Sequence, residues 1–347
     1  MWHDPEYDGS CPNFYDLAQV AYNRLSVIGS PLSVNGLPIT DYWSRNNMRI
    51  KVILNPWADR GRGIQRKETI ESLGREHGGI DLVVTQRPKQ AHDLALQAAD
   101  EGYDVVVAAG GDGTIHEVVN GLVSSHSQTK LGVLPIGSGN DFAYAMGIPT
   151  DLALAVPRLF NGTTRTIDLA RIEDARGRYQ IVDNNIGIGF DAMVVVQTEV
   201  ITRVHGFLMY FIAVLRTIAF YYQTPHLEMR FDDEEAAQAV LFLAMGVGCR
   251  SGGGFFLTPD ARYDDNLIDS CLVNPIGRLT MLGMLQQAIK GTHIHSRHVT
   301  MRQSRQISLR ANMPLPIHVD GEMFAYPQDD VRHVTITSLP AALQVIT

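Results

Sequence analysis

Cysteine is scarce in this chain of 347 residues, and its scarcity bears on where the protein works. The three cysteines, Cys11, Cys249 and Cys271, show neither paired spacing nor the spacing of metal ligands. A disulfide framework or a zinc site built on cysteine is therefore excluded, and the thiols are expected to be reduced in a cytosolic protein.

Long apolar runs are also missing from the sequence. The most hydrophobic segment, residues 207–222, is interrupted by Arg216 and is too short to cross a bilayer. Asp4, Glu6 and Asp8 occupy the place where a signal peptide carries positive charge. We therefore expect a cytoplasmic, soluble protein that contacts membranes only peripherally.

Positive charge is in short supply as well. The formal net charge is −8, and charged residues make up 19% of the chain. A general nucleic-acid-binding protein would normally be basic, so nucleic acid is excluded as a partner. Hydrophobic residues reach 45%, and the length is sufficient for about two domains.

Glycine, in contrast, is concentrated in one stretch, residues 104–121. An apolar run at 105–109 is followed by Gly110, Gly111, Asp112, Gly113 and Thr114, and then by apolar residues at helical spacing. This order predicts a buried strand, a tight turn and a helix. The free N–H groups at the start of such a helix favour a phosphate, and Asp112 suits a metal ion or a reacting hydroxyl beside it.

A second turn of the same kind follows at residues 135–141, PIGSGND, after a short apolar strand at 131–134. Both turns could be ordinary strand-to-helix connections. Their closeness in sequence favours a ligand site, because the carboxyl ends of parallel strands meet at one edge of a sheet.

The rest of the chain divides into two textures. Strands and helices alternate from residue 48 to about 161, which predicts parallel βα units. Antiparallel-looking strands dominate afterwards, among them 179–188 and 300–309. We predict an N-terminal extension (1–47) with a helix at 15–27, an α/β domain (48–164 with a C-terminal return at about 325–347) and a β domain (165–324).

Six motifs in order resemble those of the diacylglycerol kinase catalytic-domain family. They are Asn55-Pro56, the GGDGT turn with Glu117, PIGSGND running into Phe142-Ala143, NIGIGFDA at 185–192, Gly252–Gly254 with Pro259, Ala261 and Asp265, and Asp320-Gly321-Glu322. The first turn is also shared with sphingosine kinases, NAD kinases and 6-phosphofructokinases. His116 stands where the family usually has Asn, and Asp265-Asn266 replaces its Asp-Gly.

The resemblance implies a Rossmann-like nucleotide-binding domain and an antiparallel β-sandwich domain, with the active site in the cleft between them. ATP would lie over the two glycine turns and the loop after the first strand, with Mg²⁺ touching Asp112. The implied ATP-binding set is Asn55, Pro56, Trp57, Ala58, Asp59, Thr85, Gly110, Gly111, Asp112, Gly113, Thr114, Glu117, Gly137, Ser138, Asn140 and Asp141.

The Asp320-Gly321-Glu322 turn carries the implied proton acceptor. By resemblance Glu322 is the general base and Asp320 lies beside it, so Glu322, Asp320 and Asp112 form the predicted catalytic set. Two neighbouring carboxylates would raise one pKa, which suits a base that works near neutral pH. The alternative is a hairpin turn with solvated acids, because Asp-Gly is a common turn signal.

A structural magnesium ion is implied at Asp265 and the backbone carbonyls of Arg262 and Leu267. An acidic surface turn explains the same residues without a metal.

The sequence thus predicts an ATP-dependent lipid kinase, with diacylglycerol as the expected acceptor. A NAD kinase-like or other small-molecule kinase and a non-catalytic nucleotide- or lipid-binding sensor are the rivals. The apolar segment 207–222 would lie near the lipid chains or form plain core. Residues 290–310 hold five cations and no acid, so they could touch anionic headgroups or be ordinary surface. The N-terminal extension could contact a second copy to give a homodimer.

Overall fold

The structure is a computed structural model that describes residues 33–34, 37–38, 48–125, 127–201, 204 and 206–347. The chain divides into two compact units, Met1–Asn47 and Met48–Thr347. In the first unit, β1 (Ser33–Val34) and β2 (Leu37–Pro38) form an antiparallel pair. The helix predicted at 15–27 lies outside the described residues.

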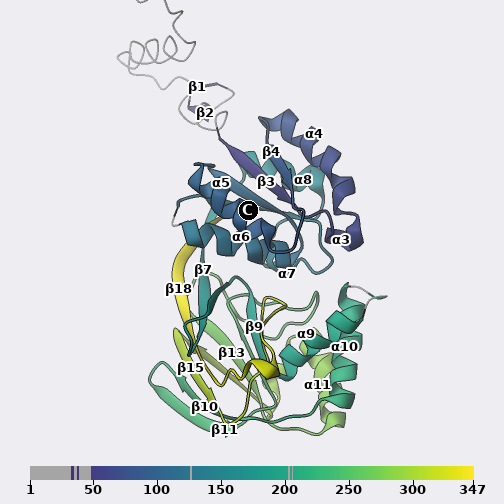
Figure 1. Ribbon diagram of the computed structural model, residues 1–347, viewed down its shortest axis with the longest axis vertical. Coiled ribbons are helices and arrows are strands. Elements are labelled where there is room, and N and C mark those ends of the chain that lie inside the picture. The colour runs from purple at the N-terminus through teal and green to yellow at the C-terminus, as the bar shows by residue number, and fades with distance from the viewer. Residues whose placement is uncertain (1–32, 35–36, 39–47, 126, 202–203, 205) are drawn as a thin grey trace, which may run out of the picture. The chain divides into compact units, whose positions relative to one another are not determined.

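The second unit begins with an α/β lobe built on four parallel strands (Figure 1). They lie in the order β4-β3-β5-β6, with bounds β3 Ile50–Leu54, β4 Asp81–Val84, β5 Val105–Gly110 and β6 Lys130–Pro135. Every residue of β5 is buried, as expected for a central parallel strand covered on both faces.

Helices cover both faces of this sheet. α5 (Gln90–Asp100) and α6 (Asp112–Ser125) pack on one face, and α4 (Lys67–His77) and α8 (Leu152–Asn161) on the other. Alternate strand residues accordingly enter different cores: Val106 and Ala108 meet α5 and α6, whereas Val105 and Val107 meet α4 and α8. The short elements are α3 (Ala58–Gly61), η2 (Gly63–Arg66) and α7 (Asp141–Ala145).

A long C-terminal strand joins the α/β lobe to the second lobe. β18 (His333–Ile346) is parallel to β6 at Val345 and Leu131, and it is antiparallel to β7 (Thr164–Asp174) and β15 (Gln306–Ala311). The pairing with β7 is interrupted between Leu339 and Leu343, where Ala341 has a φ of 50° and donates its N–H to Asp168. The tail of the chain therefore forms one long bulged strand.

The second lobe is a sandwich of two mainly antiparallel sheets. One continues from β18 through β15 to β10 (His226–Phe231) and β11 (Glu234–Ala239), with β7 and β8 (Tyr179–Val182) beside it. The other has the order β14-β13-β12-β9-β16-β17, with bounds β9 Asn185–Gly189, β12 Phe242–Gly246, β13 Ile268–Val273, β14 Val299–Ser304, β16 Ile317–Val319 and β17 Glu322–Ala325.

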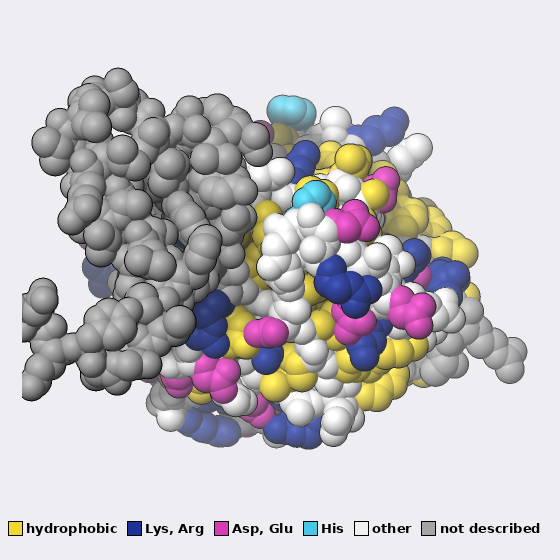
Figure 2. All heavy atoms as spheres, turned by 90° about the horizontal axis from the view of Figure 1, so that it is seen from above, with side chains coloured by type: hydrophobic (Ala, Val, Ile, Leu, Met, Phe, Trp, Pro, Cys, Tyr) yellow, Lys and Arg dark blue, Asp and Glu magenta, His cyan; other side chains and the backbone are white. Residues whose placement is uncertain are grey.

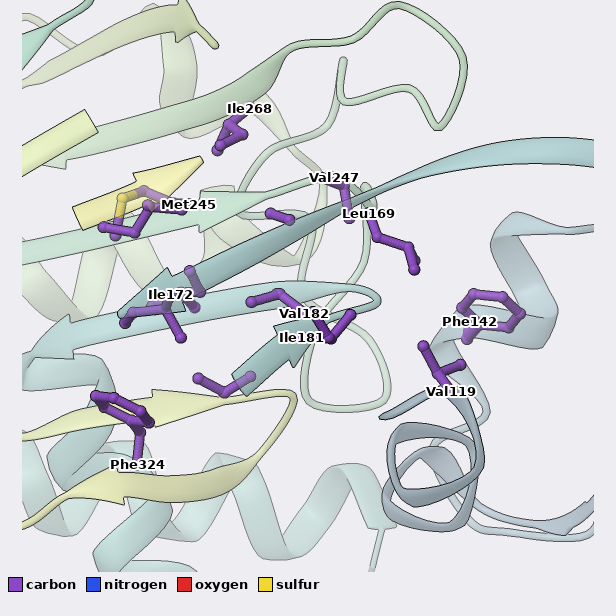
Figure 3. Packing of buried hydrophobic residues seen from close by; sticks show 14 of the residues in the cluster. Val119, Phe142, Leu169, Ile172, Ile181, Val182, Met245, Val247, Ile268 and Phe324 are labelled. Atoms are coloured by element: carbon purple, nitrogen blue, oxygen red, sulfur yellow. The ribbon is translucent and has the colours of Figure 1, made fainter. Parts of the chain in front are cut away.

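One hydrophobic core runs from the α/β lobe into the sandwich. In Figure 3, Val119 and Phe142 lie at the right, Leu169 and Val247 lie between, and Met245 lies at the left of the same core. The predicted fold class, a Rossmann-like α/β domain with an antiparallel β domain, is confirmed.

Three helices cover the outer face of the second sheet. They are α9 (Phe190–Val200), α10 (Gly206–Phe220) and α11 (Arg278–Ile289), and they lie together on one flank of the second lobe (Figure 1). Their apolar side chains meet Ala244 and Cys271, which point away from the sandwich core. Two short helical turns, η3 (Thr292–His295) and η4 (Pro327–Asp329), complete the lobe.

Two predicted strands are wrong, for the same physical reason. Residues 179–188 form β8 and β9 in different sheets, because the N–H groups of Asp183 and Asn184 bond to the carboxylate of Asp320. Residues 300–309 form β14 and β15 in different sheets, because the Arg305 N–H bonds to the carboxylate of Asp232. In each case a carboxylate takes the hydrogen bonds that a sheet ladder would otherwise use.

Candidate active site

The two glycine turns lie against each other, as predicted, at the carboxyl edge of the parallel sheet. A Cβ added to Gly137 would come within 2.3 Å of the Gly111 Cα atom, so neither backbone leaves room for a side chain. A Cβ on Gly110 would meet the Thr114 Oγ1 at 2.2 Å. The glycines thus allow two backbones and a ligand to approach closely, with the first turn of α6 facing the same space.

Two buried carboxylates, Asp112 and Asp141, lie where these turns enter α6 and α7. Burial raises the pKa of Asp112, although the N–H of Phe142 donates to its Oδ1 at 3.2 Å. Burial, followed by the charge of Asp112, raises the pKa of Asp141 to about 7. Burial and mutual repulsion disfavour the ionised form of these two acids. A bound cation would favour that form, so the pair is suited to binding one.

Asp141 also links the two lobes. Its Oδ2 accepts the Gly253 N–H at 2.8 Å, and the Arg250 Nε lies 3.1 Å from its Oδ1. The loop with Gly252–Gly254 is thereby held against the second glycine turn, and the guanidinium of Arg250 stacks over the Tyr144 ring. The cleft is closed on this side by a charged and aromatic contact.

The loop after β3 supplies the opposite wall. The side chain of Asn55 donates to the Thr114 Oγ1 at 3.0 Å and accepts the Trp57 N–H, so it fixes the loop to the glycine turn. Asp59 and Arg60 have φ values of 48° and 64°, which marks a tight left-handed turn there.

Glu117 has a more local role than the one predicted. Its two oxygens accept the N–H groups of Lys89 and Ala91 at 3.1 and 3.0 Å, so it anchors the start of α5. Burial raises its pKa. Its carboxylate therefore shapes the cleft through α5, while part of the residue still lines it.

The Asp320-Gly321 turn joins β16 to β17. Both residues have positive φ, 51° and 84°, as a two-residue hairpin turn of this hand requires. The alternative of a turn with solvated acids does not hold for Asp320, because its side chain is buried. Its carboxylate accepts the N–H groups of Asp183, Asn184 and Asn185 at 3.0, 3.0 and 2.7 Å. The turn is thus pinned from inside.

His116 of α6 completes this buried cluster. Its Nδ1 lies 2.8 Å from Asp320 Oδ2 and 3.3 Å from Asp183 Oδ1, and the shorter contact takes the hydrogen bond. Burial opposes an imidazolium, but both acids outweigh it and raise the pKa of His116 well above its usual value. Burial likewise opposes ionisation of Asp320, yet His116 and the backbone N–H groups lower its pKa.

The pKa of Asp183 is shifted in the opposite direction to that of Asp320. Burial, followed by the charge of Asp320, raises its pKa well above the usual range. His116, Asp183 and Asp320 offer three ligand atoms within 4.8 Å of one another. Because the imidazolium already neutralises the ionised acid, we read the trio as an internal ion pair rather than a metal site.

Glu322 is the carboxylate that reaches the glycine turn. Its Oε1 lies 3.3 Å from the position of a Cβ on Gly113. Both oxygens of Asp320 are occupied by buried donors, whereas Glu322, two residues later, reaches the glycine turn. The predicted pair of adjacent acids is therefore divided, with Asp320 positioning the turn and Glu322 meeting the cleft.

A cavity of about 680 Å³ joins these groups. Its wall contains most of the predicted set: Asn55, Trp57, Ala58, Asp59, Gly111, Asp112, Gly113, Thr114, Glu117, Gly137, Ser138, Asp141, Asp320 and Glu322. Pro56, Gly110 and Asn140 adjoin these residues in the sequence but do not line the cavity. Thr85 is buried at the end of β4 and does not line it.

The cavity continues between α9, α10, α11 and the second sheet, where its lining becomes apolar. Tyr210 of α10 lies at the junction, and burial, followed by the charges of Asp141 and Asp112, raises the pKa of its hydroxyl. Asp191 of α9 is there too, with its Oδ2 3.0 Å from His318 Nε2. A polar, acidic half and an apolar half thus share one space.

Each lobe of the chain matches a known protein family. Residues 49–172 match the family described as "Diacylglycerol kinase catalytic domain", and residues 184–347 match "YegS C-terminal NAD kinase beta sandwich-like domain". A "Probable lipid kinase YegS-like" of Chromohalobacter salexigens is 31% identical over 76% of this chain and 84% of its own. The chain belongs to the diacylglycerol kinase catalytic-domain family.

Further relatives of this lipid kinase carry the same family name. A "Diacylglycerol kinase" of Mycobacterium tuberculosis is 29% identical over 86% of this chain and 94% of its own, and one of Bacillus subtilis is 29% identical over 79% and 89%. The crystal structure of a diacylglycerol kinase from Bacillus anthracis has the same fold, with a TM-score of 0.64 at 19% identity over 86% and 96%. The described helices of this kinase include none long and apolar enough to cross a membrane.

The predicted structural magnesium site of the kinase lies away from the cavity. Asp265 accepts the Leu267 N–H at 3.0 Å, and the Arg262 side chain bonds to Asp264. Burial, with the charges of Asp265 and Asp260, raises the pKa of Asp269 to about 6. Asp260, Asp265 and Asp269 therefore lie near one another, and magnesium binding at Asp265 stays a prediction.

Several residues of the cleft carry no signal in the sequence. Asp183 and His318 bond to partners 137 and 127 positions away, and Tyr210 lies near the distant Asp141 and Asp112. Arg250 lies in no motif that predicts its contact with Asp141. His116 did carry a signal, since it departs from the family's usual Asn inside the first motif.

Proposed function

We propose that this lipid kinase transfers the γ-phosphoryl group of ATP to the hydroxyl of diacylglycerol, giving phosphatidic acid. The observation that carries the proposal is the position of Glu322, which the second lobe holds against Gly113 of the phosphate-type glycine turn. The same cavity continues from this point into an apolar space. A glycine turn, a carboxylate and an apolar space thus follow one another in the cavity, which supports this order of nucleotide, base and lipid.

The phosphates of ATP are assigned to the glycine turns. Gly111 and Gly137 leave no space for side chains, so backbone N–H groups and the start of α6 face the ligand directly. The loop from Asn55 to Asp59 and the hydroxyl of Ser138 border the same part of the cavity. The family's kinase activity supports ATP as the donor.

The chemistry of Asp112 and Asp141 fits a magnesium ion. Carboxylate oxygens are the ligands that Mg²⁺ prefers, and burial raises the pKa values of both acids, with the charge of Asp112 adding to the shift of Asp141. When bound, Mg²⁺ would neutralise charge on the transferring phosphoryl group. Asp112 and Asp141 would hold it, and the N–H of Phe142 keeps the Asp112 carboxylate oriented.

Glu322 is proposed as the general base. The acceptor hydroxyl gives its proton to the Glu322 carboxylate while its oxygen bonds to the γ-phosphorus, and the bond from that phosphorus to the β,γ-bridging oxygen breaks to release ADP. Asp320 positions this turn through its three backbone hydrogen bonds and His116.

The apolar half of the cavity favours a lipid over NAD. Its lining includes Val194, Val214, Leu241, Phe255 and Met284, which suit acyl chains and offer nothing to a second nucleotide. A sensor without catalysis would have no use for Glu322 beside the glycine turn.

The test is a phosphorylation assay with purified protein, Mg-ATP and a panel of acceptors. Diacylglycerol, a sphingoid base, phosphatidylglycerol and NAD are compared, and diacylglycerol is expected to be the best acceptor. A preference for NAD would replace the proposal with the small-molecule kinase, and ATP binding without any transfer would favour the sensor. Mg²⁺ is replaced by EDTA in a parallel arm, where turnover should vanish.

A further inference from the structure

Large apolar side chains are concentrated on the outer side of α10 and α11. Of the thirteen exposed large hydrophobic residues in the described part of the chain, eight lie between Val200 and Tyr222 or on α11. The most exposed are Leu279 at 85% and Phe220 at 81%. We call Leu208, Leu215, Phe220, Leu279 and Leu282 the apolar flank. An exposed cluster of this kind marks an interaction surface.

The inner sides of the same helices are also apolar and line the cavity. Met209, Val214 and Ile218 of α10 face it, as do Met281 and Met284 of α11. A helix at a protein surface needs only one apolar face to cover a core. The apolar flank is therefore apolar surface beyond what α10 and α11 need to cover the core. The same helices form the wall of the apolar half of the cavity.

The two helices that carry the flank contain no acid, although Glu199 on the neighbouring helix α9 is exposed. The sequence from Val204 to Leu227 and from Ser270 to Val319 contains no Asp or Glu, although the whole chain has a net charge of −8. Arg216 lies on α10, and Lys290 follows the last turn of α11. Arg278 begins α11; its Nε donates to the Ile218 carbonyl and its guanidinium lies over the Tyr222 ring. By contrast, the end of the α/β lobe in Figure 2 shows acidic and basic side chains intermixed.

We propose that the apolar flank inserts into the interface of an anionic bilayer, with Arg216, Arg278 and Lys290 at the headgroups. Apolar side chains bordered by cations are the pattern of a helix that lies in the membrane surface. The acceptor then enters the cavity across the helices that touch its bilayer. The inference rests on the proposed function in taking a bilayer lipid as the acceptor.

The experiment measures sedimentation of the full chain with vesicles of phosphatidylcholine, with and without phosphatidylglycerol. The wild type should bind the anionic vesicles more tightly. The double variant Phe220→Ser, Leu279→Ser should lose about tenfold or more in partitioning, because two large side chains no longer leave water. Arg278→Gln should lose roughly fivefold on anionic vesicles only.

The matched control is Leu154→Ser on α8, which is 59% exposed in the other lobe. It should bind vesicles as the wild type does. None of the changed residues lines the cavity, so every variant should phosphorylate monomeric dioctanoylglycerol normally while the double variant fails on vesicles.

Two outcomes would overturn the inference. One is wild-type vesicle binding by the double variant. The other is a wild type that ignores vesicles and dimerises through this flank, shown by sedimentation velocity in which the double variant is monomeric. Failure of the proposed function is a separate result: the protein would bind vesicles through the flank but phosphorylate diacylglycerol in neither form.

Discussion

Two buried acidic clusters meet at the cleft, and they are balanced in opposite ways. Asp112 and Asp141 have raised pKa values because burial and mutual repulsion disfavour their charges. Asp320 has a lowered pKa because His116 and three backbone N–H groups stabilise its charge. In the first cluster two acids share one cation, Arg250. In the second cluster the one ionised acid, Asp320, has its own cation in His116.

The difference teaches which cluster expects a ligand. Asp112 and Asp141 share one counter-charge, Arg250 beside Asp141, so this pair gains from binding a cation. Asp320 is already paired with an imidazolium, so it gains nothing from a cation and serves the fold. This separates the predicted catalytic acids by role. Asp112 lies at the glycine turns, where we propose that the nucleotide binds, and Asp320 supports the turn that carries Glu322.

Removing the first cluster should have the largest effect. We expect Asp112→Ala to reduce turnover by roughly 10³- to 10⁵-fold, because charge on the transferring phosphoryl group is no longer neutralised. The measurement is the initial rate with saturating Mg-ATP and diacylglycerol. The circular dichroism spectrum should match the wild type, and turnover near normal would show that this turn does not hold the nucleotide end.

Glu322→Gln should separate chemistry from binding. The change keeps size and polarity but removes the proton acceptor, so the rate should fall about 10²- to 10⁴-fold. ATP binding, followed by calorimetry, should hardly change because the phosphate contacts come from the glycine turns. A variant with nearly normal turnover would exclude Glu322 as the base.

Local sequence was enough to find the glycine turns. Their spacing, with an apolar strand before and a helix after each turn, determines backbone conformation within a few residues. The contact between Gly111 and Gly137 then follows from parallel strand order. The same logic failed for residues 179–188, where an acid more than 130 positions away, Asp320, takes the backbone N–H groups.

The balance of charge could not be read from the sequence. Asp320 and Glu322 look like two equivalent acids on one turn, and only the fold buries one against His116 and points the other at Gly113. Likewise, the sequence allows segment 207–222 to be either part of a lipid site or plain core. In the structure one face of this segment lines the cavity and another is exposed. Burial depends on distant segments, so such choices need the tertiary structure.

The second cluster can be tested with one isosteric substitution at two positions. Asp320→Asn should destabilise the protein by about 2–4 kcal/mol, because a charged acceptor of several hydrogen bonds is lost and His116 is left unpaired. Asp183→Asn should change stability by less than about 1 kcal/mol, since the raised pKa of Asp183 means the folded protein already holds it neutral.

Urea unfolding followed by circular dichroism gives both values. Equal losses for the two variants would contradict the assignment of charge to Asp320. If Asp320 acts only by positioning Glu322, the Asp320 variant should lose turnover while its KM for ATP stays near the wild-type value.

The smallest expected effect is a pH dependence of cation binding at the first cluster. Asp141 has a pKa of about 7 in the folded protein and an ordinary value of 3.8 when unfolded. Between these values the folded state binds more protons, so this group makes the cation-free protein less stable as pH rises toward 7. A cation must displace the shared proton, and its apparent affinity should therefore fall about tenfold between about pH 8 and pH 6.

Calorimetric titration of the nucleotide-free protein with Mg²⁺ at the two pH values measures this change directly. Asp141→Asn should weaken binding and remove most of the pH dependence, because the proton belongs to the Asp112–Asp141 pair. Asp100→Asn, the same substitution at the exposed end of α5, should leave both unchanged. Affinity for Mg²⁺ that is independent of pH in the wild type would mean that the pair is already ionised, and the contrast between the two clusters would then be lost.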